Sequence, residues 1–379
     1  MADQIAPNPY PATPASERME AGQQRAAMIE NSLLNGVELR NVGPTVMSGR
    51  IVDVDVNPDD PTQMYVAYAS GGVWVSRTNG QSFEPVFDHE AVMTVGDIAV
   101  DWRNGERLWV GTGENNASRS SYAGAGVWVR DDTSSTFRHV GLGETHRTGR
   151  IVIHPDDPNV AWVAAAGALY SPSRDRGMYR TTDGGRTWTQ TLFVNDNTGA
   201  IDLVRATDGT LYAAMWERTR RAWDFVEAGA GSRIYKSTDD GATWARVQGS
   251  GFPGGESVGR IGLDVHPDGT LYVSVDNQAR QPDEPSDDTP AVLTKDVLRS
   301  MNRDAFLQVA AADIDDYLET NGFPASYTAK SILKMVRDGD ITPVALVDYL
   351  EDANAQLFDT PVIGAEVYRS DDQGRTWTR

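Results

Sequence analysis

Residues 181–188 read Thr-Thr-Asp-Gly-Gly-Arg-Thr-Trp, and variants of this stretch recur along the chain. Two further clear copies occupy residues 237–244 and 370–377, and two weaker copies occupy 76–83 and 130–137. The first residues of the five copies lie 54, 51, 56 and 133 residues apart. A repeat of about 50 residues is typical of a propeller or a solenoid. The last interval corresponds to one repeat plus an insertion.

The repeated segment has the chemistry of a tight turn between two strands. Asp183 is placed to accept hydrogen bonds from the backbone N–H groups that follow it, and Gly185 takes a positive φ without strain. Thr187 and Trp188 favour the start of the next strand, with the indole ring packed back over the turn. We therefore expect these segments to be structural turns and not calcium or catalytic sites.

A second repeated segment marks the first strand of each unit. Residues 48–58, 148–155 and 258–267 share a Gly-Arg-Ile core followed by a short β-branched run, and looser versions occupy 95–101 and 199–204. Three more strand patterns follow in each period, the last one beginning at the aromatic residue of the repeated turn. Four strands per period make one propeller blade. The sequence predicts an all-β fold, a β-propeller of four-stranded antiparallel blades, with about five blades in this chain.

The chain divides into a lead-in, a propeller and an insertion. Residues 1–37 are predicted to be a flexible N-terminal segment, because their start is rich in proline. Residues 38–379 are predicted to form the propeller, and 281–360 an α-helical insertion of four or five short helices in the fifth blade. Residues 38–43 match a fourth strand. They either complete a five-bladed ring or belong to a larger propeller, and we expect the larger propeller.

Composition excludes several classes of function. The chain has 379 residues, a formal net charge of −20 and no cysteine. The negative charge argues against a nucleic-acid partner, and the lack of cysteine excludes disulfides and thiolate zinc sites. The five histidines are scattered, so we predict no metal site and no cofactor. No stretch is apolar enough for a transmembrane helix, and the first residues lack the pattern of a signal peptide.

Every long loop of the predicted propeller connects a second strand to a third strand. These loops, at residues 111–125, 166–177 and 216–233, share the face opposite the repeated turns. Elaboration of one face is typical of a binding or catalytic mouth, and its arginines and aromatic residues suit anionic groups or sugar rings. The candidate ligand-binding residues are Arg50, Arg150, Arg260, Asn115, Asn116, Arg119, Arg174, Arg176, Arg218, Arg220 and Trp223.

Two questions about this face stay open at the level of sequence. Arg50, Arg150 and Arg260 occupy equivalent repeat positions, so they either bind a ligand or brace adjacent blades by pairing with carboxylates. Glycoside hydrolysis requires two carboxylates, separated by about 5 Å in retaining enzymes and about 6.5–9.5 Å in inverting ones. The catalytic candidates are Glu114, Asp175, Glu217 and Asp224. No catalytic motif is matched.

The pattern Ser/Thr-x-Asp-x-Gly-x-Thr-Trp resembles the Asp-box of bacterial-neuraminidase-repeat propellers, which include sialidases, xyloglucan-cleaving glycosidases and sortilin-type receptors. The chain after Leu39, with Gly-Thr-Gly-Glu-Asn-Asn at 111–116, is similar to exported bacterial proteins described as sortilin-like or glycosyl-hydrolase-like. This resemblance implies a periplasmic or extracellular propeller whose leader is not present in this chain. The first-strand motif Ser-Gly-Arg-Ile at 48–51 differs from the sialidase Phe/Tyr-Arg-Ile-Pro. We therefore carry over no activity.

Two functions of different classes follow. The first is an exported binding or interaction module that recognises a glycan, an anionic ligand or a protein or peptide partner at the arginine-rich face. In this reading the helices within residues 294–357 are the natural contact for a larger assembly. The alternative is a glycoside hydrolase, xyloglucanase-like or sialidase-like, that uses carboxylates in the same loops.

Overall fold

The computed structural model describes residues 11–37, 49–103, 105–281, 293–350 and 362–379. The chain separates into two compact units. The larger unit is Met1–Ala279 with Gly364–Arg379, and the smaller unit is Arg280–Ile363. The fourth strand predicted at residues 38–43 lies outside the described residues.

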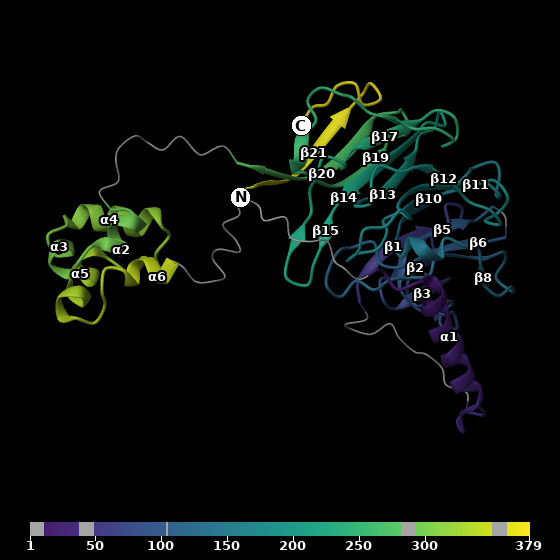
Figure 1. The fold of residues 1–379 in the computed structure, drawn as a ribbon, viewed down its shortest axis with the longest axis horizontal. Coiled ribbons are helices and arrows are strands. Elements are labelled where there is room, and N and C mark those ends of the chain that lie inside the picture. The colour runs from purple at the N-terminus through teal and green to yellow at the C-terminus, as the bar shows by residue number, and fades with distance from the viewer. Residues whose placement is uncertain (1–10, 38–48, 104, 282–292, 351–361) are drawn as a thin grey trace. The chain divides into compact units, whose positions relative to one another are not determined.

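The larger unit is built from consecutive antiparallel sheets, and within each sheet the strands lie side by side in chain order (Figure 1). The first sheet contains β1 (Ile51–Val56), β2 (Met64–Tyr68), β3 (Gly72–Ser76) and β4 (Glu84–Pro85). The second contains β5 (Val95–Asp101), β6 (Arg107–Thr112), β7 (Val127–Arg130) and β8 (Arg138–His139). The third contains β9 (Thr148–Ile153), β10 (Ala161–Ala165), β11 (Gly177–Thr181) and β12 (Thr189–Leu192).

The fourth and fifth sheets repeat this plan with additions. The fourth contains β13 (Thr198–Arg205), β14 (Leu211–Glu217), β17 (Ile234–Ser237) and β18 (Ala245–Arg246), and a small hairpin of β15 (Thr219–Arg220) and β16 (Phe225–Val226) follows β14. The fifth contains β19 (Val258–Val265), β20 (Leu271–Arg280) and β21 (Val362–Ser370). A bridge between Arg369 and Thr378 begins a further strand beside β21.

The sheets are arranged as propeller blades. Their first strands β1, β5, β9, β13 and β19 are neighbours in that order, and among the described residues the blades are not closed into a ring. Hydrophobic clusters lie between successive blades. One joins Val73 of β3 to Val110 of β6, and another joins Trp109 of β6 to Val163 of β10. This burial of apolar strand faces against the next blade is the main stabilising contribution of the fold.

The repeated turns share one hydrogen-bond pattern. In residues 181–188 the Asp183 carboxylate accepts from Thr187, at 2.9 Å from the backbone N and 2.7 Å from Oγ1. The same two bonds join Asp239 to Thr243 and Asp372 to Thr376. Each clear copy follows the third strand of its blade. The prediction that the repeats are equivalent strand-to-strand turns is confirmed.

The N-terminal segment contains more regular structure than expected. Helix α1 (Ala15–Glu30) lies within the segment predicted to be a flexible lead-in. Its sequence is rich in Ala, Glu, Gln, Met and Arg, which favour helices, and the prolines stand before it. Arg18 Nη2 donates to the Gly143 carbonyl at 2.6 Å, and Ala15 N donates to Glu144 Oε1 at 2.9 Å. These contacts attach α1 to the short 3₁₀ helix η1 (Gly143–Thr145) before the third blade.

The smaller unit is helical, as predicted for the insertion. It contains α2 (Lys295–Ser300), α3 (Arg303–Phe306), α4 (Ala311–Thr320), α5 (Ala329–Asp338) and α6 (Ala345–Leu350). Leu298, Phe306, Leu318, Ile332 and Val347 are buried together in its own core. Residues 351–357 of the predicted helical region fall outside the described residues. None of the described helices combines the length and the apolar character that crossing a membrane requires.

Candidate ligand-binding face

The long loops of three blades meet on one face of the larger unit. They follow the second strands β6, β10 and β14, at residues 113–126, 166–176 and 218–233. Arg119 Nε in the first of these loops donates to the Ala222 carbonyl in the third at 2.9 Å. Tyr170 of the second loop donates from its hydroxyl to the Arg119 carbonyl at 3.4 Å. The three loops are therefore linked directly.

Arg150 of β9 connects the first strands of several blades. Its Nη1 donates to Asp97 Oδ1 at 3.1 Å and lies 3.5 Å from Asp53 Oδ1, and its Nε donates to Asp202 Oδ1 at 3.1 Å. Asp97 is only 1% exposed. Burial raises the pKa of Asp97 well above its usual value, although the nearby Arg150 opposes that rise. Burial also raises the pKa of Asp53. One arginine thus faces three carboxylates, and the raised pKa values of Asp97 and Asp53 favour the protonated forms of these two.

The same carboxylates bind the backbone of the following blade. Asp97 Oδ2 accepts from the Ile151 backbone N at 2.6 Å, and Asp202 Oδ2 accepts from the Leu263 backbone N at 2.8 Å. These aspartates were not among the candidates predicted from the sequence. Their signal was an acidic residue inside an otherwise β-branched first strand, where a charged side chain needs a partner.

Arg50 and Arg260 also form hydrogen bonds with side chains of the protein. Arg50 donates to both oxygens of Glu114, at 2.8 Å and 2.6 Å. Asn116 donates to Glu114 Oε1 at 3.0 Å and accepts from Arg260 Nη1 at 2.9 Å. Arg260 also lies over the ring of Trp216, 5.5 Å from its centroid. Arg50 and Arg150 therefore have the carboxylate partners that the bracing alternative requires, whereas Arg260 is held by the Asn116 amide. The role of all three in ligand binding stays a prediction.

The four catalytic candidates differ in their surroundings. Glu114 is fully buried, and burial alone favours its neutral form. Hydrogen bonds from Arg50 and Asn116 outweigh this effect and hold the pKa of Glu114 below its usual value. A general acid needs the opposite shift. Glu217 Oε2 accepts from Gly231 N at 2.6 Å. Asp224 Oδ2 lies 3.3 Å from Arg221 Nη1, and Asp175 Oδ2 accepts from the Ser173 hydroxyl at 3.2 Å.

The remaining candidates differ in what their side chains contact. Asn115 and Arg176 are tied to backbone carbonyls: Asn115 donates to Gly96 and Gly149, and Arg176 to Ala166, Ala168 and Ser171. Arg174 and Arg220 lie over the rings of Phe193 and Phe225, at 5.3 Å and 4.7 Å from the centroids. Trp223, at the tip of the β15–β16 hairpin, is 73% exposed.

A small cavity of about 210 Å³ opens between the loops of the third and fourth blades. Arginine dominates its lining and no acidic residue contributes to it. The lining residues are Leu169, Tyr170, Ser171, Pro172, Arg176, Asn197, Arg218, Thr219, Arg220 and Arg221. The structure thus brings three predicted ligand-binding residues, Arg176, Arg218 and Arg220, into one pocket.

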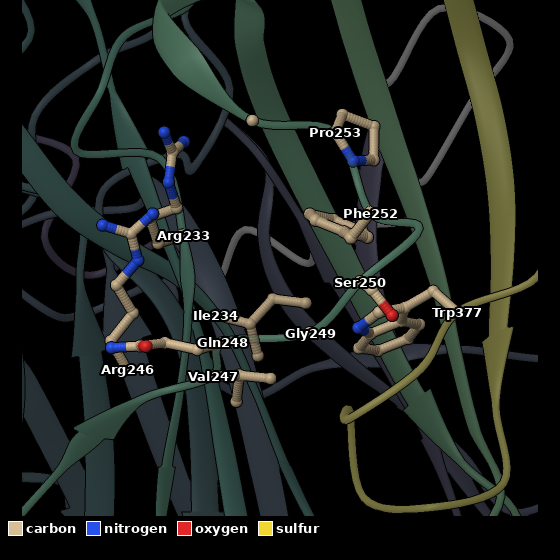
Figure 2. Close-up of a pocket in the computed structure, with 11 residues that line it drawn as sticks. Arg233, Ile234, Arg246, Val247, Gln248, Gly249, Ser250, Phe252, Pro253 and Trp377 are labelled. Carbon is tan, nitrogen blue, oxygen red and sulfur yellow. The ribbon is translucent and has the colours of Figure 1, made fainter.

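A larger cavity of about 580 Å³ lies between the fourth blade and the C-terminal part of the fifth. Figure 2 shows Arg233 and Arg246 on one side of it, with Phe252 and Trp377 on the other. The rings of Phe252 and Trp377 lie 5.3 Å apart, so they form a contact between blades. None of the residues predicted from sequence lines this cavity.

Comparison with known proteins gives distant relatives. No family model matches the chain. The chain is 31% identical over 160 residues to a xyloglucanase of Hypocrea jecorina, a match that covers 41% of this chain and 17% of that protein. It is 25% identical over 262 residues to a xyloglucanase of a Paenibacillus species, covering 63% of this chain and 24% of the relative. The chain thus spans about a quarter or less of the length of these curated relatives.

Among solved structures, an ancestral GH74 enzyme superposes with a TM-score of 0.47 and 18% identity. The superposition covers 65% of this chain and 32% of that enzyme.

Proposed function

We propose that this chain is the polysaccharide-binding part of a xyloglucanase-like glycoside hydrolase, an exported propeller of the Asp-box type. The observation that carries this proposal is the sequence similarity to two curated relatives, both named xyloglucanase. Because the chain spans only 17% and 24% of their lengths, hydrolysis by the whole protein is part of the proposal.

Exposed aromatic side chains on the linked loops support binding of a sugar chain. Tyr122 is 60% exposed in the loop of the second blade, and Trp223 is 73% exposed in that of the fourth. The hydrogen bond from Arg119 to Ala222 joins these two loops next to Trp223. Large exposed aromatic residues cost solvation free energy unless a ligand covers them, and their faces suit the apolar faces of sugar rings. The two aromatics are therefore the proposed platform for the polysaccharide.

Titration of the full chain with a xyloglucan oligosaccharide tests this platform. Trp223→Ala and Tyr122→Ala should each weaken binding about tenfold, which corresponds to ~1.4 kcal/mol. Tyr272→Ala is the matched control, because Tyr272 is 40% exposed on β20, outside these loops. Equal affinity of all three variants and the wild type would exclude the face as a xyloglucan site.

Hydrolysis would use carboxylates at the end of β14 and in the loop that follows it. Glu217 and Asp224 lie at the two ends of the segment that carries β15, and neither shares the buried ion pair of Glu114. In the enzyme reading, Glu217→Gln or Asp224→Asn keeps oligosaccharide binding and abolishes release of reducing ends.

A binding module without turnover is the second candidate function. The observation that favours it is that each of the four candidate carboxylates has a hydrogen-bond partner within the protein. In that reading, wild-type chain binds the oligosaccharide and releases no reducing ends. The helical unit would then serve as the contact to a larger assembly.

A further inference from the structure

Arg218 is the most isolated buried charge among the residues that the structure describes. It follows β14, lines the 210 Å³ cavity and is only 2% exposed. None of its guanidinium nitrogens, Nε, Nη1 or Nη2, has a hydrogen-bond partner. Its guanidinium lies over the ring of Trp216, whose centroid is 4.8 Å from Cζ.

The charges around Arg218 make its isolation more costly. Its charged neighbours are Arg176, Arg147 and Arg260. Burial first, and these three cations second, lower the pKa of Arg218 well below its usual value. Arg176 donates from Nη1 and Nη2 to three backbone carbonyls, whereas none of the Arg218 nitrogens has a hydrogen-bond partner. A buried cation without a partner strongly opposes folding. An anion in the cavity removes that cost.

We propose that this cavity is an acidic-sugar subsite, in which Arg218 binds the carboxylate of a uronate residue in the polysaccharide; this assignment rests on the proposed function. The planar guanidinium matches a carboxylate with two parallel hydrogen bonds. A neutral glucan supplies no such group. The subsite therefore extends the proposed substrate from a neutral xyloglucan to a chain that carries uronate.

The size and lining of the cavity favour a sugar acid. Its 210 Å³ corresponds to about seven water molecules at ~30 Å³ each, which is room for one ring and its carboxylate. Asn197 and Thr219 offer an amide and a hydroxyl for sugar hydroxyl groups, and Leu169 and Pro172 offer apolar surface. The loop that supplies Arg218 also carries the exposed Trp223.

The test compares a uronate ligand with its neutral ester on the full chain. Trigalacturonate should bind the wild type at least tenfold tighter than its methyl ester, because the ester removes the charge and adds only a methyl group. Arg218→Met should weaken trigalacturonate binding about 10- to 100-fold, the range for losing charge-assisted hydrogen bonds. Arg246→Ala is the matched control, since it removes an arginine from the cavity in Figure 2.

A stability measurement keeps the test decisive if Arg218→Met changes folding. Without ligand, this variant should melt at the same or a higher temperature than the wild type, because it removes an unpaired buried charge. Trigalacturonate should raise the melting temperature of the wild type and not that of the variant. A large drop in the melting temperature of the ligand-free variant would show that Arg218 is a structural brace, and would overturn the proposal.

Further outcomes would overturn parts of the proposal. Equal binding of the acid and the ester, or loss of binding in Arg246→Ala alone, overturns the assignment to Arg218. A tripeptide with a free C-terminal carboxylate tests the sugar assignment. If it binds tighter than trigalacturonate and its binding also depends on Arg218, the sugar assignment is overturned. Xyloglucan oligosaccharide is measured in parallel. Retained xyloglucan binding without uronate binding defeats only this inference, whereas uronate binding without xyloglucan binding defeats only the proposed function.

Discussion

Arg150 of β9 donates a hydrogen bond from Nη1 to Oδ1 of Asp97 in β5 at 3.1 Å, which joins two neighbouring blades near their first strands. Asp97 is 1% exposed, whereas the Arg150 side chain is 38% exposed. The pair therefore places a nearly dry carboxylate against a cation that still reaches water. Because Asp53 and Asp202 contact the same guanidinium, the arrangement depends on this one positive charge.

Replacing Arg150 by Met should destabilise the larger unit. The change leaves Asp97 buried without its cation, and breaking a buried pair costs about 3–5 kcal/mol. The partial exposure of Arg150 places the expected loss near the lower end of that range. Urea unfolding measures it. Adding Asp97→Asn to the variant should restore part of the stability, and a double variant less stable than Arg150→Met alone would contradict the bracing role.

Acid should weaken the repeated turns in a defined pH window. Hydrogen bonds from Thr187, Thr243 and Thr376 lower the pKa of Asp183, Asp239 and Asp372 to about 2. An unfolded Asp titrates near ~3.9, so below that pH the unfolded chain binds more protons. The contribution of these turns is therefore complete above about pH 4 and is lost as the pH falls toward 2.

Thermal melting of the wild type and of Thr243→Val between these pH values measures the effect. The variant removes the hydroxyl donor to Asp239 and should lose less stability on acidification than the wild type. An identical pH dependence in both proteins would show that this turn does not contribute to acid sensitivity.

The helical unit should be removable without unfolding the propeller. Residues 281–360 lie wholly within the compact unit Arg280–Ile363, which has its own core of Leu298, Phe306 and Ile332. Replacing residues 281–360 by a short Gly-Ser bridge should leave a single cooperative unfolding transition. Calorimetry of the full chain should show a second transition that disappears in the deletion. Loss of cooperative unfolding in the deleted protein would mean that the helices support the blades.

The repeated turns could be predicted from the sequence because their contacts are local. Asp183 and Thr187 are four residues apart, and the pattern that joins them is visible in the residues themselves. The helical unit was predictable for the same reason, since Thr294 caps α2 and Gly339, at φ 83°, ends α5. Helix α1 was not predicted, because the prolines before Ala15 are typical of a flexible segment, although helix-forming residues follow them.

The ion pairs and unpaired charges of the site were harder to predict from the sequence because they depend on tertiary contacts. Asp97 meets Arg150 across 53 positions of sequence, and Arg260 meets Asn116 across 144. Arg218 was a sequence candidate, but its lack of partners follows from the way the loops of two blades close around it. A sequence pattern identifies charged residues in a loop and not which of them the fold leaves unpaired.

Hydrogen–deuterium exchange of the full chain with and without xyloglucan oligosaccharide tests the central claim most directly, because it maps the face that the polysaccharide covers. We predict slower exchange in the linked loops at residues 113–126 and 218–233. The repeated turns at 181–188 and 237–244, at the opposite ends of the strands, should be unchanged. Protection of those turns in place of the loops, or no protection in either, would contradict the proposed polysaccharide-binding face.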